Sequence, residues 1–154
     1  MTLLNGWTGE HNTGIEIMNR FHVAIDELIE LNKLNRKVNS INKNVLNYTH
    51  YLAEFCTVRV DVGRRIGKTE YVKDNYYPYT DILIVNNFNQ KRYYPMDFVV
   101  YTIDEVVEGF VRKSHLKPEN VWIDDAFLTE EELKIVYNLF EDKNIEQTFI
   151  ILGK

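Results

Sequence analysis

The sequence predicts a three-layer α/β domain with a mostly parallel central sheet and helices at its N-terminus. From about residue 57 to the C-terminus, apolar runs of strand length alternate with segments of helical spacing. The run at 81–85 is apolar almost throughout, as in strands that are buried on both faces. The chain has 154 residues, of which 45% are hydrophobic, so one domain with a well-packed core is expected.

The N-terminal region is expected to be a helical extension over residues 1–42, joined to a core over 43–154 in the same compact domain. The first dozen residues are polar and read as turns, and a capping box at Thr13–Glu16 starts a helix over about 14–33. A loop follows, and a second helix is predicted over 44–54. The apolar residues that recur at helical spacing in the first helix are Ile15, Met18, Ile25, Leu28 and Ile29, and those expected on one face of the second are Val45, Tyr48, Leu52 and Phe55.

The core shows strand and helix signals in alternation. Strands are expected at 57–62, 81–87, 98–103, 121–127 and 148–154, and helices at 67–74, 104–113 and 129–141. The stretch 87–97 reads as a loop. Inward residues of the helix at 104–113 are Val106, Val107, Phe110 and Val111, and Thr129–Glu132 forms a capping box for the last helix.

A loop rich in glycine and cations follows the first strand. Its residues are Gly63, Arg64, Arg65, Ile66, Gly67, Lys68 and Thr69. The end matches the phosphate-loop pattern GxxxxGK[ST], although Val62 stands where the pattern has its first glycine. Backbone N–H groups and the helix N-terminus would bind phosphates there, Lys68 would neutralise the β- and γ-phosphates, and Thr69 would ligate Mg²⁺. The alternative is an ordinary strand-to-helix turn with surface cations.

Two acidic residues end a later apolar strand. Asp124 and Asp125 follow Val121–Ile123, which is the form of a Walker B motif. Asp124 would hold Mg²⁺ together with Thr69, and Asp125 would polarise the attacking water. Asp125 is one methylene shorter than the glutamate usual at this place, which indicates slow hydrolysis. Alternatively, both acids cap the next helix or face solvent.

Adjacent acids after this strand are typical of the ATPase class that has an additional strand between the phosphate-loop strand and the Walker B strand. The runs 81–85 or 98–103 are expected to fill that place, with 148–154 as the strand after Walker B. In this class that last strand often ends in a polar sensor residue, but here it ends in Gly153 and Lys154.

Over residues 44–154 the chain resembles the ATPase domain of phage terminase large subunits. Those proteins carry a helix, a strand and a loop of the form [SGA]-R-[RQ]-x-G-K-[ST], in which the first glycine of the standard pattern is commonly absent, and GRRIGKT has this form. The resemblance implies that Arg64, beside Arg65, acts in cis on the γ-phosphate. It also implies a metal role for Asp124, a catalytic role for Asp125 and a viral origin. Terminase large subunits are several times longer and carry a nuclease domain, so the resemblance does not extend to a complete packaging motor.

Three functions stay open from the sequence. The first is an ATP- and Mg²⁺-dependent NTPase linked to DNA transactions, and the second is a nucleotide-binding regulatory or interaction module with little turnover. The third is a small phosphotransferase, although no arginine-rich lid segment is evident. Expected partners are nucleotide and a homo-oligomer or a larger viral assembly. The net charge of −5 gives DNA binding no general support.

Other features have ordinary explanations. The four histidines and the single Cys56 lack metal-ligand spacing, and His22 reads as a partly buried structural residue. The tyrosines of NYYPY and KRYYP either stack on a base or cover a sheet edge, and Lys33, Arg36, Lys37 and Lys43 read as a solvated face.

No signal peptide or membrane span is evident, so a cytoplasmic protein is expected, in the host cytoplasm if viral.

Overall fold

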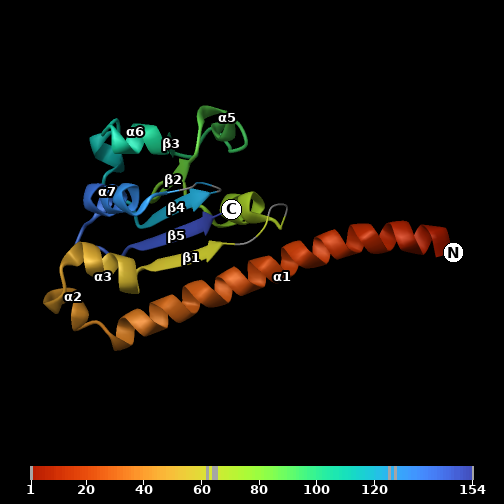
Figure 1. Cartoon of the computed structure of the whole chain (residues 1–154), viewed down its shortest axis with the longest axis horizontal. Coiled ribbons are helices and arrows are strands. Elements are labelled where there is room, and N and C mark those ends of the chain that lie inside the picture. The colour runs from red at the N-terminus through yellow and green to blue at the C-terminus, as the bar shows by residue number, and fades with distance from the viewer. Residues whose placement is uncertain (1, 62, 64–65, 125, 127, 154) are drawn as a thin grey trace.

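A five-stranded sheet, all parallel, forms the centre of the molecule (Figure 1). The structure is a computed structural model that describes residues 2–61, 63, 66–124, 126 and 128–153, with side chains from residue 13 onward. The strands are β1 (Thr57–Asp61), β2 (Asp81–Val85), β3 (Val100–Thr102), β4 (Asn120–Asp124) and β5 (Thr148–Gly153). The helices are α1 (Thr2–Val38), α2 (Asn42–Val45), α3 (Tyr48–Phe55), α4 (Lys68–Asn75), α5 (Phe88–Lys91), α6 (Ile103–Val107) and α7 (Glu130–Phe140), with a 3-10 turn at Lys113–His115.

Helices cover both faces of the sheet, which gives the three layers predicted from the sequence. Alternate residues of each buried strand point to opposite faces, so β2 sends Ile82 and Ile84 to one core and Leu83 and Val85 to the other. The first core is closed by α3, α6 and α7, and the second by α1 and α4. Burial on both faces explains why these strands read as continuous apolar runs.

The strand order is β1-β5-β4-β2-β3. β5 therefore lies between β1 and β4, pairing Asp61 with Gly153 and Asp124 with Leu152. The expectation that 81–85 or 98–103 fills this place is wrong, because β2 pairs with β4 and β3 lies at the outer edge. Sequence order alone does not determine which strand crosses back into the middle of a parallel sheet.

The N-terminal region is one long helix, so the predictions of turns before residue 13, a capping box at Thr13–Glu16 and a loop after residue 33 are wrong. Polar residues are tolerated here because α1 contacts the domain along one face only. Phe21 and Ile25 are buried against the second core and Ile29 packs on it. By contrast, Ile15 and Leu28 are exposed.

Several short helices also differ from the predictions made from the sequence. Val45 belongs to α2 and is exposed, so it is not on the inward face of the second predicted helix. α6 ends at Val107, and both Val107 and Phe110 are exposed because the chain leaves the sheet surface after one turn and a half. A short helix, α5, begins inside the predicted loop 87–97. The capping box at Thr129 is confirmed, with the Thr129 side chain accepting a hydrogen bond from the Glu132 backbone N–H.

Two buried charges tie the amino-terminal edge of the sheet together. The Asp81 carboxylate accepts hydrogen bonds from Trp122 Nε1 at 2.9 Å, Asn120 Nδ2 at 3.0 Å, the Thr80 hydroxyl and the Tyr77 backbone N–H. The Arg36 guanidinium of α1 donates to Gln147 O at 3.1 Å, among further acceptors on α1, α3 and β5. Arg36 is only 6% exposed, so its assignment to a solvated face is wrong.

Candidate functional site

The described residues of the predicted phosphate loop, Gly63 and 66–69, follow β1 and lead into α4 at the carboxyl edge of the sheet, where ligands bind in parallel α/β sheets. Gly67 is the N-cap of α4 with φ 100°, a left-handed conformation that favours glycine. α4 begins at Lys68 and Thr69, so its first backbone N–H groups and its partial positive charge face the same edge. This prediction of where the strand ends and the helix begins is confirmed.

Lys68 links the start of α4 to the end of β5. Its Nζ donates to the Gly153 carbonyl at 2.7 Å, and the side chain is 6% exposed. An added Cβ at Gly153 would lie 2.1 Å from Asp61 Oδ1, so a larger residue there would displace the exposed Asp61 carboxylate. The ammonium group is therefore held at the ends of β1 and β5, beside the start of α4.

Thr69 and Asp124 meet as the metal prediction requires. The Thr69 hydroxyl donates to Asp124 Oδ2 at 2.9 Å, and Asp124 is 2% exposed at the end of β4. The Tyr94 hydroxyl also donates to Asp124 Oδ2. A threonine hydroxyl beside one carboxylate fits Mg²⁺, which usually takes one or two protein oxygens and completes its shell with water and phosphate.

Helix α1 supports the loop from the side. An added Cβ on Gly67 would lie 2.5 Å from Met18 Cγ, and His22 Nε2 lies 3.3 Å from the Gly67 carbonyl oxygen. The Tyr71 hydroxyl donates to Asp26 of α1 at 2.6 Å, and burial followed by this bond raises the pKa of Tyr71. His22 is partly buried, as predicted, but its contact with the loop was not foreseen.

The remaining predicted site residues divide into two groups. Gly63 is exposed with open space around its α-carbon, and Ile66 packs against the second core. The expectations for Val62, Arg64, Arg65, Asp125 and Lys154 lie outside the described residues.

Tyr94, Met18, His22 and Gly153 were missed by sequence reasoning. Tyr94 belongs to the aromatic segment KRYYP, in which it is buried while Tyr93 is exposed. No periodicity distinguishes these two neighbours, because the segment is neither strand nor helix at that point. Of the other tyrosine cluster, Tyr76 is buried and Tyr79 is fully exposed.

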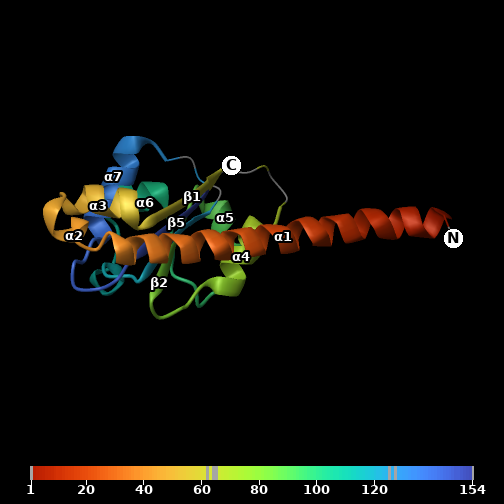
Figure 2. The same ribbon diagram turned by 90° about the horizontal axis from the view of Figure 1, so that it is seen from below.

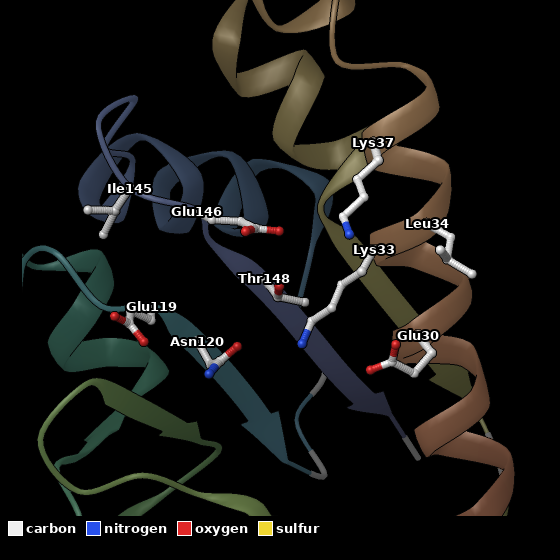
Figure 3. A pocket seen from close by; sticks show the side chains of 9 residues that line it. All are labelled: Glu30, Lys33, Leu34, Lys37, Glu119, Asn120, Ile145, Glu146 and Thr148. Atoms are coloured by element: carbon white, nitrogen blue, oxygen red, sulfur yellow. The ribbon is translucent and has the colours of Figure 1, made fainter.

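A separate pocket lies at the opposite, amino-terminal edge of the sheet. Lys33 and Lys37 reach into it from α1, with Glu119 before β4 and Thr148 at the start of β5 on its other side (Figure 3). Because it contains acids as well as lysines and lies at the far ends of the strands from Lys68, this pocket is not part of the phosphate loop.

Two kinds of feature are absent from the described residues. Nowhere in the described part of the chain do three or more His, Cys, Asp or Glu side chains gather so that they could hold a metal ion by themselves. Among the described helices, none has both the length and the apolar character that a membrane crossing requires.

Comparison with models of known protein families, with curated proteins and with solved structures gave no match for this chain. The resemblance to terminase ATPase domains therefore stays a prediction from the motifs.

Proposed function

We propose that the protein binds ATP with Mg²⁺ at the carboxyl edge of its sheet and hydrolyses it. The observation that carries the proposal is the 2.9 Å hydrogen bond from the Thr69 hydroxyl to Asp124. These residues are 55 positions apart, and both were selected from the sequence as metal-holding groups. Their meeting at one point is what a shared Mg²⁺ site requires.

The phosphate half of the site is supported by Gly67, Lys68 and the start of α4. The left-handed Gly67 turns the chain so that the first N–H groups of α4 face outward from the strand ends. Lys68 is buried within reach of the same edge, and its ammonium would exchange the Gly153 carbonyl for phosphate oxygens when nucleotide binds.

The strand order gives a third line of support. A strand lies between β1 and the Asp124 strand, as in ATPases with an additional strand, although that strand is β5 and not one of the two expected from the sequence. For turnover we assign the water-polarising role to Asp125 and the γ-phosphate contact to Arg64. A role in viral DNA transactions is carried by the motif resemblance alone.

The second candidate is a nucleotide-binding module with little turnover, and the end of β5 favours it. Its last described residues, Leu152 and Gly153, have no polar side chain that could contact a γ-phosphate. Nucleotide binding would then act by moving Lys68 off the Gly153 carbonyl, which changes how α4 is held to β5.

The test compares wild type, Lys68→Ala and Lys73→Ala for ATP affinity, with and without Mg²⁺, and for phosphate release. Lys73 is the matched control because it lies on the same helix and its ion pair with Glu70 is on the surface. We expect Lys68→Ala to lose micromolar ATP binding and Lys73→Ala to retain it. Equal affinity in all three proteins would overturn the phosphate-loop assignment.

Turnover separates the two candidates. Phosphate release that is lost in Asp125→Asn, with binding kept, supports the NTPase. Lys68-dependent binding without phosphate release, even after addition of single- or double-stranded DNA, supports the module instead. Turnover retained in Asp125→Asn would reassign the catalytic acid.

A further inference from the structure

Helix α1 carries a second apolar face that is exposed. Ile25 faces the sheet, while Leu28 is 41%, Leu31 62% and Val38 82% exposed. Each residue of an α-helix is rotated by about 100° from the one before it. The exposed side chains therefore form a stripe along α1 that is centred about 100° around the helix axis from buried side chains such as Ile25. Figure 2 shows α1 running across the molecule with its outer side uncovered.

The stripe repeats every seven residues. Ile17, Ala24, Leu31 and Val38 are spaced by seven, and Leu28 and Asn35 each stand three residues before one of them. This is the a/d spacing of a two-stranded coiled coil, with Leu28 and Asn35 at a and the other four at d. Phe21, at the a position before Leu28, is buried in the second core, so both a and d positions are free to pair only from Ala24 to Val38. None of these six positions carries a charge, although most of the residues around them on α1 are polar or charged.

We propose that α1 pairs with α1 of a second copy of the chain, parallel and in register, through this stripe. The occupant is a second copy because a stripe with one heptad spacing along its whole length is complementary to itself, as a two-fold interface requires. From Ile17 to Val38 it extends over about 31 Å of helix, or three heptads.

The parallel direction follows from where the sheet sits on α1. The buried and exposed stripes are centred on the same stretch of the helix but face about 100° apart. If the two helices are parallel, the two-fold axis runs along them and places the two sheets on opposite sides of the helix pair. If the helices are antiparallel, the axis is perpendicular to them and places both sheets on the same side at the same height, where they would overlap.

Asn35 supports the same arrangement. It is the one polar residue among the six stripe positions. In a parallel, in-register pair its amide faces the amide of the partner's Asn35 and can hydrogen-bond with it. In other registers Asn35 would face an apolar side chain, which costs stability, so this residue specifies the pairing. The pairing stands independently of the proposed nucleotide site.

The test is cysteine cross-linking along the stripe. Native Cys56 is 2% exposed, so an introduced thiol reacts without competition from it. We expect Leu31→Cys and Ile17→Cys each to form a homodisulfide under mild oxidation, because facing d positions come within disulfide reach. Lys33→Cys, on another face of α1, is the matched control and should stay uncrosslinked.

Two outcomes would overturn the proposal. If Leu31→Cys cross-links no more than Lys33→Cys, α1 does not pair through this stripe. If a mixture of Ile17→Cys and Leu31→Cys chains yields the mixed disulfide, the helices run antiparallel, because in a parallel pair these positions are about 21 Å apart.

Solution mass gives an independent readout. Wild type should elute with twice the 18.3 kDa chain mass in light scattering, and Leu31→Glu should elute as a monomer with unchanged circular dichroism. The fold tolerates this change because Leu31 is exposed. Leu31→Met should remain dimeric, because it keeps an apolar side chain that is unbranched at Cβ at this d position. A wild-type monomer at 100 µM or above would overturn the proposal.

Discussion

Asp81 and Asp124 are equally buried at opposite edges of one sheet, and their surroundings differ. Each is 2% exposed. Asp81 accepts hydrogen bonds from an indole, an amide, a hydroxyl and a backbone N–H. Asp124 accepts hydrogen bonds from the hydroxyls of Thr69 and Tyr94.

The difference shows that burial of a carboxylate does not by itself mark a functional site. Indole, amide and backbone N–H groups can only donate, so they hold Asp81 permanently as part of the fold. A hydroxyl can donate to the carboxylate while its oxygen binds a cation, so the partners of Asp124 are compatible with Mg²⁺. The same substitution at both positions should therefore have opposite consequences.

The largest expected effect on stability is that of Asp81→Asn. The new amide nitrogen would replace one carboxylate oxygen, so it would face either Trp122 Nε1 and the Tyr77 backbone N–H or Asn120 Nδ2 and the Thr80 hydroxyl. In either case a buried N–H donor loses its acceptor. We expect a loss of about 3 kcal/mol in the free energy of unfolding, a large share of the roughly 5–15 kcal/mol of a domain. Urea denaturation measures it, with exposed Asp74→Asn as the control. Equal midpoints for the two variants would contradict the structural role of Asp81.

Asp124→Asn should have little effect on stability and a larger effect on nucleotide binding. Its remaining oxygen still accepts from Thr69, so we expect a stability change below about 1 kcal/mol. The lost negative charge should weaken Mg²⁺-dependent ATP affinity about 10-fold or more, with little effect on binding in EDTA. Calorimetry at several Mg²⁺ concentrations measures the difference. A stability loss as large as that of Asp81→Asn would remove the contrast between the two edges.

Gly67→Ala should produce a smaller, mixed effect. A left-handed backbone conformation and the 2.5 Å approach of its Cβ to Met18 Cγ both oppose alanine there. We expect a loss of about 1–2 kcal/mol, together with weaker ATP binding because the loop is displaced. Adding Met18→Ala removes the contact but not the backbone strain. Urea denaturation of the single and double variants should therefore show partial recovery, and full recovery would assign the whole cost to Met18.

The sequence predicted what depends on local pattern. The strands, the start of α4 and the cap at Thr129 follow from alternation, glycine and capping residues, and all three were located correctly. The apposition of Thr69 and Asp124 was also predictable, because the carboxyl ends of parallel strands share one edge.

What the sequence did not predict depends on contacts between distant segments. The position of β5 between β1 and β4 is set by chain crossovers, which leave no mark on the apolar runs. Similarly, Arg36 resembles any surface arginine until Gln147 and Thr148 are brought against it. The length of α1 was missed because one contact face and ordinary helix propensity maintain it through polar sequence.

The smallest expected effect concerns His115, beside the first core. Its Nδ1 lies 2.5 Å from the Tyr101 hydroxyl, and burial, followed by the charge of Arg112, lowers the pKa of His115 below its usual 6.5. The unfolded chain then binds this proton more readily than the folded one, so stability is complete above about pH 6.5 and falls as the pH drops below it. His115→Asn removes the titration and keeps an acceptor for Tyr101. Between pH 7.5 and 5.5 the wild-type Tm should fall by about 1 °C more than that of His115→Asn. Carboxylates titrate alike in both proteins, so parallel curves would show that His115 is not held neutral by the fold.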